Sequence, residues 1–151
     1  MSKYDISKFR NVTVALNTPF QKDGSVDVEA VKAVCRYFRD KGIKQMYVCG
    51  STGEGFLLDT EERMLVAETV VNEVGKDMNI IVHVGCPDTR HSCMLASHAE
   101  KIGAAATSAV PCVSTDQARK AFTSTGPRLQ KLQIFLSSFI TFPSLPDLTF
   151  P

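Results

Sequence analysis

The sequence predicts an α/β protein in which a parallel sheet is covered by helices. Segments that are apolar on both faces alternate with amphipathic segments at intervals of roughly 30 residues, which is the spacing of strand–helix–strand units. Gly42, Gly75 and Gly103 stand where the amphipathic segments end. The chain has 151 residues, of which 44% are hydrophobic and 22% are charged, and this is enough for one domain with a sizeable core.

Each element has its own local signals. The expected strands are residues 12–16, 45–49, 79–85 and 104–110, and the expected helices begin at Asp27, at Asp59, and at Asp88 or Thr89. The first strand is expected to be buried, and Pro19 follows it because proline cannot continue a ladder. Asp59 and Glu62 have the spacing of a capping box, which predicts where the second helix begins.

The alternation of strands and helices stops after Pro111. From Cys112 onward the sequence contains no Glu and no Tyr, while Ser, Thr, Phe and Pro are crowded together. Pro143, Pro146 and Pro151 exclude a regular element at the end. We therefore expect residues 1–111 to form the first part of a domain and residues 112–151 to be a divergent tail, produced by a frameshift or by alternative splicing.

Charge and composition exclude several classes of partner. A net charge of +1 leaves no electrostatic footprint for nucleic acid or an anionic membrane. No signal-peptide core follows the polar N-terminus, and no apolar run approaches the ~20 residues needed to span a bilayer, so a cytoplasmic protein is expected. The five cysteines form no Cys-x-x-Cys pair and are expected to be free thiols. His83, His91 and His98 lack the spacing of metal ligands, so neither a metal nor another cofactor is expected.

The most informative stretch is residues 46–55, an apolar strand that runs into a pair of hydroxyls flanked by glycines. Ser51 and Thr52 follow the end of this strand, where hydroxyls and free backbone N–H groups can hold a carboxylate. The flanking glycines are expected to let the backbone approach a ligand and adopt positive φ. The stretch matches neither common phosphate loop. The ends of the parallel strands are expected to face one cavity, with Thr18, Ser51, Thr52, Gly85 and Pro111 around it.

Four motifs in order give the chain a family resemblance over about residues 9–111. They are residues 15–20 (ALNTPF), 50–54 (GSTGE), 61–63 (EER) and 83–85 (HVG). Together they resemble the pyruvate-dependent class I aldolases of the dihydrodipicolinate synthase and N-acetylneuraminate lyase family. The resemblance implies an eight-stranded (β/α) TIM barrel, of which this chain holds about the first four strands and three helices. It also implies a homotetramer, and a pyruvate carboxylate or other 2-keto acid bound by Ser51, Thr52 and Gly50.

The chain departs from the family in its catalytic residues. The family uses a lysine on strand six to form a Schiff base with pyruvate and a tyrosine on strand five to move a proton. The tyrosines of this chain all lie upstream of that position: Tyr4, Tyr37 and Tyr47. Lys120 and Lys131 come too early and are expected to be solvated, so no catalytic residue is predicted.

Two further residues are given structural interpretations. His98, on the inner face of the third helix, is expected to be a packed, hydrogen-bonded core histidine and not a catalytic base. Glu54 is expected to brace or cap the turn from Gly50 to Gly55.

Three accounts of function stay open at this stage. The first is a lyase subunit that cleaves N-acetylneuraminate to pyruvate and N-acetylmannosamine, which residues 83–85 favour over the synthase branch. The second is a non-catalytic truncated product, either inert or a partner of full-length subunits, which the change of composition at Cys112 favours. The third is a synthase-like pyruvate aldolase that uses another aldehyde.

Overall fold

The computed structural model describes residues 7–109. Its strands are β1 (Thr13–Ala15), β2 (Gln45–Val48), β3 (Asn79–His83) and β4 (Ala106–Ser108). Its helices are α1 (Val28–Asp40), α2 (Thr60–Val74) and α3 (Thr89–Lys101), and a short 3-10 helix, η1 (Ser7–Phe9), precedes β1. The predicted alternation of strands and helices is therefore confirmed, although all four strands are shorter than expected.

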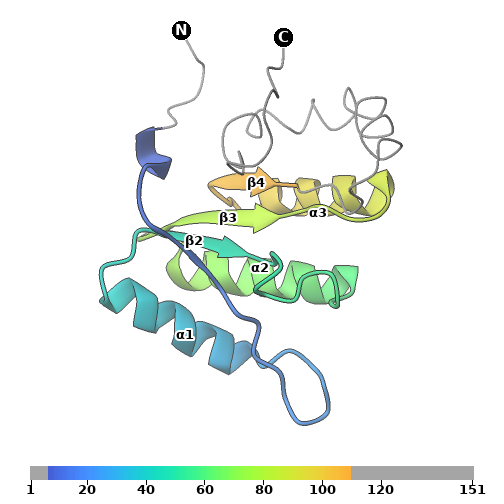
Figure 1. Cartoon of the computed structure of the whole chain (residues 1–151), viewed down its shortest axis with the longest axis horizontal. Helices are drawn as coiled ribbons and strands as arrows, with labels where there is room; N and C mark the ends of the chain where they lie inside the picture. The colour runs from blue at the N-terminus through green and yellow to red at the C-terminus, as the bar shows by residue number, and fades with distance from the viewer. Residues whose placement is uncertain (1–6, 110–151) are drawn as a thin grey trace, which may run out of the picture.

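The four strands form one parallel sheet in the order β1-β2-β3-β4, of which Figure 1 labels β2, β3 and β4. Ala15 pairs with Tyr47, Tyr47 with Ile81, and Ile81 with Ala106, so these four residues lie in one row across the sheet. Parallel strands that follow one another in sequence and in space require each helix to return the chain to the same end of the sheet. The carboxyl ends of all four strands consequently meet at one edge.

The core lies between the sheet and its helices. Met46, Val48, Ile80 and Val82 project from β2 and β3 into it, and all four are at least 97% buried. The helices contribute buried side chains from their facing stripes: Val31, Cys35, Val66, Val70, Leu95 and Ala99. Because side chains alternate across a strand, the intervening residues Gln45, Tyr47, Ile81 and His83 face the other side of the sheet.

Aspartates cap all three helices. Asp27 accepts a hydrogen bond from the Ala30 N–H (2.9 Å), and Asp88, not Thr89, caps α3 by accepting one from the His91 N–H (3.0 Å). Asp59 and Glu62 form the predicted capping box, with N···O distances of 2.7 and 3.0 Å. Short-range sequence signals thus fix where each helix begins.

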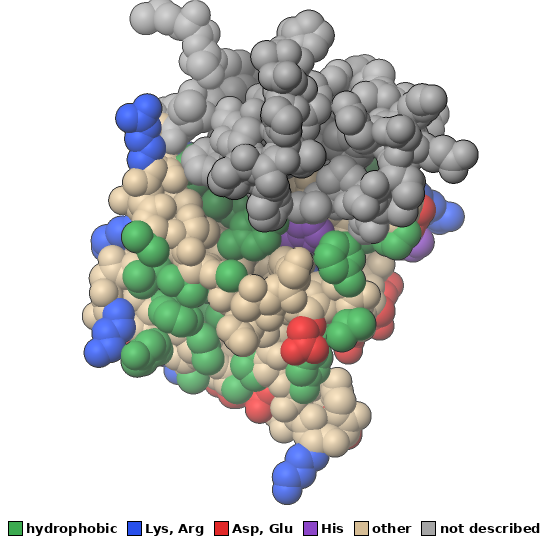
Figure 2. Space-filling model, viewed as in Figure 1, with side chains coloured by type: hydrophobic (Ala, Val, Ile, Leu, Met, Phe, Trp, Pro, Cys, Tyr) green, Lys and Arg blue, Asp and Glu red, His purple; other side chains and the backbone are tan. Residues whose placement is uncertain are grey.

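The prediction of a buried first strand is wrong. Thr13 and Ala15 are exposed, Val14 is half-buried, and the adjoining Val12 is 75% exposed. The reason is that β1 lies at the edge of the described sheet, so one side of it has no neighbouring strand there. Figure 2 shows apolar side chains at the surface on the side of β1 and α1.

Several predictions fall on residues outside the described range. These are the predictions for Tyr4, Pro111, Cys112, Lys120 and Lys131, and for the boundary between residues 1–111 and 112–151. Among residues 7–109, no helix is both long and apolar enough to cross a membrane.

The capping box should contribute measurably to stability. Replacing an N-cap aspartate by alanine leaves the Glu62 N–H without its acceptor, so Asp59→Ala should lower the free energy of unfolding by about 1 kcal/mol. Urea denaturation followed by circular dichroism measures this change. Asp77→Ala, at an exposed aspartate just beyond α2, is the matched control. Equal unfolding midpoints for the two variants would contradict the prediction.

Candidate active site

The loop between β2 and α2 is closed by its own backbone. The Gly55 N–H donates to the Gly50 carbonyl (3.0 Å) and the Glu54 N–H to the Ser51 carbonyl (3.1 Å). The buried Thr18 hydroxyl donates to the Gly53 carbonyl at 2.7 Å, which ties the loop to the segment that follows β1. The structure thus brings Thr18 and the predicted hydroxyl pair to the same strand ends.

Ser51 and Thr52 are both exposed at the start of this loop. Within residues 7–109, neither hydroxyl and neither backbone N–H of this pair has a hydrogen-bond partner. Two adjacent residues therefore present four donors to solvent from a loop that is closed by the bonds from the Gly55 and Glu54 N–H groups. A carboxylate accepts hydrogen bonds from hydroxyl and N–H groups of this kind.

The expected role of the glycines in this loop is wrong in one respect. Positive φ occurs at Cys49 (58°) and Glu54 (54°), and not at Gly50, Gly53 or Gly55. The glycines are needed because the backbone packs closely, since a Cβ on Gly55 would lie 1.9 Å from the Cys49 carbonyl oxygen. Glu54 does brace the turn, but the contacts come from its backbone and its side chain is exposed.

Tyr47 projects from β2 on the face of the sheet opposite the helices. Its hydroxyl donates to the Ser108 Oγ on β4 at 3.1 Å. Burial raises the pKa of Tyr47, and the hydrogen bond with Ser108 opposes that effect only in part, so the phenol stays neutral at physiological pH. We did not single out Tyr47 as part of the site from the sequence, although the period-two alternation along β2 could have placed it on this face.

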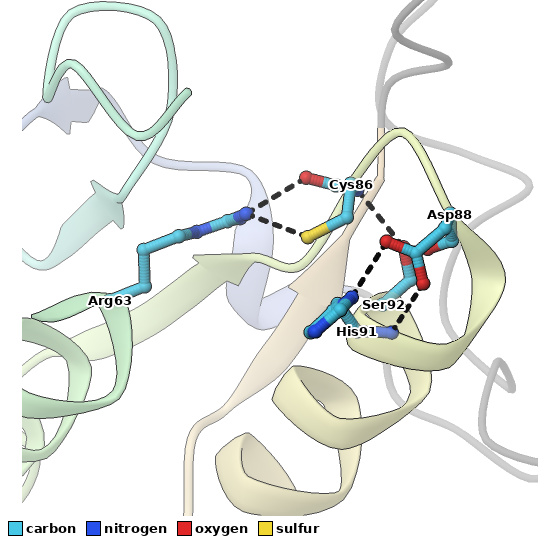
Figure 3. Close-up of polar contacts among 6 residues, drawn as sticks. Arg63, Cys86, Asp88, His91 and Ser92 are labelled. Carbon is cyan, nitrogen blue, oxygen red and sulfur yellow. Dashed lines mark hydrogen bonds and ion pairs between the residues drawn. The ribbon is translucent and has the colours of Figure 1, made fainter. Parts of the chain in front are cut away.

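Arg63, on α2, is 96% buried and reaches the end of β3 (Figure 3). Its Nη2 donates to the His83 carbonyl (2.7 Å), and its Nη1 donates to the Gly85 carbonyl and to the Cys86 Sγ, both at 3.0 Å. No carboxylate of residues 7–109 forms a salt bridge with this guanidinium. Gly85 is one of the residues expected around the cavity, and its carbonyl accepts a hydrogen bond from Arg63.

His83 lies next to Arg63 at the end of β3 and is only 2% exposed. Burial, together with the Arg63 charge, lowers the pKa of His83 to about 4, and a hydrogen bond to the Cys49 backbone opposes the shift. The Phe56 ring packs edge-on against the imidazole, with ring centroids 5.5 Å apart. His83 is thus a neutral, enclosed side chain between β3 and the hydroxyl loop.

His98 is not the core histidine that the helix pattern predicted. It is half-buried in an open groove between α2 and α3, lined also by Met64, Cys93 and Lys101, and its Nε2 lies 3.8 Å from a Glu68 oxygen. The buried residues of α3 are Ser92, Leu95, Ala96 and Ala99, and His98 lies at the edge of the surface that they form.

The cysteines in the described part of the chain are free, as predicted. Burial raises the pKa of the Cys35 thiol to about 12 and that of the Cys49 thiol to about 11, so both stay protonated. No group of three metal-ligating side chains gathers anywhere in residues 7–109.

A parallel sheet with helices packed on one face, and a loop of free hydroxyls at its carboxyl edge, is the arrangement of one part of an α/β-barrel enzyme. Residues 8–114 match the dihydrodipicolinate synthetase family, and the chain belongs to that family.

The relatives that match this chain are named for two different activities, a synthase and a lyase. The chain is 45% identical over 94 residues to a 4-hydroxy-tetrahydrodipicolinate synthase of Chlorobaculum parvum, a match that covers 62% of this chain and 32% of the relative. It is 36% identical over 107 residues to an N-acetylneuraminate lyase of Mediterraneibacter gnavus, covering 71% and 34%. The structure of a catalytic-lysine mutant of the Ruminococcus gnavus sialic acid aldolase superposes with a TM-score of 0.71 at 31% identity, covering 82% of this chain and 43% of that one. The chain thus spans about a third of the length of the relatives that it matches.

The neutral state of His83 should make stability depend on pH. The unfolded chain protonates this ring near pH 6.5, whereas the folded chain keeps it neutral down to about pH 4. Unfolding therefore takes up a proton in this window, and the free energy of unfolding should fall as the pH drops from 6.5 towards 4, by about 3 kcal/mol for this group. Urea denaturation at pH 7 and pH 5 measures the slope.

Other groups also titrate in this range, so the pH dependence of the free energy of unfolding of His83→Phe serves as the reference. The variant should lose stability less steeply than the wild type over the same interval, because it has no ring to protonate. Identical slopes for the two proteins would contradict the prediction.

Proposed function

We propose that this chain forms the pyruvate-binding part of an N-acetylneuraminate lyase, with Ser51 and Thr52 holding the carboxylate of the 2-keto acid and Gly50 allowing its close approach. The observation that carries the proposal is the pair of exposed hydroxyls after β2, which have no hydrogen-bond partner in the described part of the chain. A planar carboxylate has two oxygens and can accept from both hydroxyls and from the adjacent N–H groups. Pyruvate, and the keto end of N-acetylneuraminate, both supply that group.

The choice of lyase over synthase rests on His83. The lyase branch resembles this chain at residues 83–85, and here His83 contacts both Arg63 and the hydroxyl loop. The lyase of Mediterraneibacter gnavus aligns over more of the chain than the synthase of Chlorobaculum parvum does. The higher identity of the synthase favours the second candidate, a pyruvate aldolase that condenses another aldehyde.

The chemistry of the family needs a lysine amine that attacks the keto carbon of pyruvate, with loss of water, to form a Schiff base. Neither Lys120 nor Lys131 has the sequence context of that lysine. We therefore propose that this chain alone binds the 2-keto acid without turning it over, and that lyase activity, tetramer formation and a cytoplasmic location belong to the complete enzyme.

Pyruvate binding tests the carboxylate site. Titration of the 15N-labelled chain with pyruvate should shift the amide resonances of Ser51, Thr52 and Gly53, with a dissociation constant on the order of millimolar. Ser51→Ala and Thr52→Val should each weaken binding about threefold to tenfold, the usual loss for one hydrogen bond. Ser97→Ala, on α3, is the matched control and should not alter binding. Shifts confined to other parts of the chain would contradict the site.

Borohydride trapping tests the absence of catalysis. Reduction in the presence of pyruvate, followed by mass spectrometry, should leave the chain without a covalent adduct, because neither Lys120 nor Lys131 has the sequence context of the lysine that forms the Schiff base in the family. A full-length lyase treated in parallel is the positive control. A specific adduct on Lys120 or Lys131 would contradict this part of the proposal.

A further inference from the structure

We propose that His83 is a positioning residue, whose imidazole links Arg63 to the Cys49 carbonyl and thereby sets the conformation of the loop that carries Ser51 and Thr52. The role of that loop in binding a carboxylate rests on the function proposed above. The positioning itself depends only on contacts within the chain.

The first link is the pair Arg63 and His83. Nη2 of Arg63 lies 3.3 Å from Nδ1 of the imidazole and donates to the carbonyl of the same residue at 2.7 Å. A guanidinium has donors and no acceptor, so Nδ1 must be the acceptor and the ring proton is assigned to Nε2. Arg63 therefore fixes both the orientation of the ring and its tautomer.

The second link joins the ring to Cys49. Val48 pairs with Val82 where β2 and β3 lie side by side, so the residues that follow them, Cys49 and His83, are neighbours across the sheet. The ring of His83 forms a hydrogen bond with the Cys49 backbone, and this bond favours the protonated ring, so the Cys49 carbonyl is the acceptor. With Nδ1 already engaged, the donor is the Nε2–H. This carbonyl is also the atom against which Gly55 packs, at a position that leaves no room for a Cβ.

The third link is the conformation of Cys49 itself. Its φ of 58° is in the left-handed region, which side chains with a Cβ disfavour and which persists only where the surroundings hold it. Ser51 and Thr52 follow two and three residues later, so the direction of the Cys49 peptide determines where their hydroxyls point. Phe56 packs on the same imidazole from the far end of the loop. His83 thus contacts both ends of the segment that it positions.

Two substitutions separate positioning from simple space-filling. His83→Phe keeps an aromatic ring beside Phe56 and keeps the bond from Arg63 to the carbonyl of residue 83, but it removes both ring nitrogens. His83→Gln keeps one acceptor for Arg63 and one donor for Cys49. His98→Phe, the same change in the open groove between α2 and α3, is the matched control.

The primary readout is amide hydrogen exchange in the full chain without ligand. His83→Phe should speed exchange of the Gly55 N–H, which donates to the Gly50 carbonyl, by about tenfold, while the Leu16 N–H, bonded to the Tyr47 carbonyl, keeps its rate. His83→Gln should retain most of the protection at Gly55, and His98→Phe all of it. If His83→Phe leaves Gly55 as protected as in the wild type, the proposal is overturned.

If His83→Phe does not fold, the comparison of His83→Gln with the wild type decides, and loss of protection at Gly55 in folded His83→Gln overturns the proposal.

Pyruvate affinity is the second readout. His83→Phe should weaken pyruvate binding about threefold to tenfold, and His83→Gln should restore most of it. A wild-type chain that does not bind pyruvate would refute the proposed function, while the exchange rates would still decide the role of His83. Faster exchange at Gly55 with unchanged pyruvate affinity would support the positioning of the loop by His83 and would contradict the proposed role of that loop in binding the carboxylate.

Discussion

The buried guanidinium of Arg63 is the contact on which the carboxyl edge of the sheet depends. It comes from α2, donates to two carbonyls and a sulfur at the end of β3, and orients the ring of His83. Burying a charge without a carboxylate partner is costly, and the Arg63 Nε has no hydrogen-bond partner among residues 7–109. The two hydrogen bonds to carbonyls, each worth roughly 1.5–3 kcal/mol when the donor is charged, offset part of this cost.

The arrangement of these groups carries a chemical consequence. Arg63 uses its donors on the backbone of β3, so its charge is not presented directly to a ligand at the hydroxyl loop. The loop instead offers neutral donors from Ser51 and Thr52, and its shape is set by a neutral imidazole. A site of this kind can hold a carboxylate in a fixed orientation and still leave the keto carbon open to a nucleophile that the rest of a barrel supplies.

The helix starts and the position of the hydroxyl pair could be predicted from the sequence, because the residues that determine them are close together in the chain. The capping box of Asp59 and Glu62 spans three residues, and the run of hydroxyls after β2 is contiguous. The contacts that shape the site are not local, since Arg63 and His83 are 20 residues apart and Cys49 follows a different strand, β2. No sequence period encodes the positive φ of Cys49 or the edge position of β1, because both depend on which elements pack beside them. The prediction that His98 lies in the core is wrong for a similar reason. Helical periodicity predicts which side of α3 faces the core, but not how far around the helix the buried side chains extend.

The central claim is that the pair of hydroxyls at the end of β2 is a carboxylate site. A crystal structure of the chain with pyruvate tests it most directly. The account predicts a carboxylate whose two oxygens lie within hydrogen-bond distance, about 2.7–3.2 Å, of the Ser51 and Thr52 donors, with the Cys49 carbonyl still bound to His83. Pyruvate bound elsewhere, with the two hydroxyls unoccupied and the loop unchanged, would contradict it.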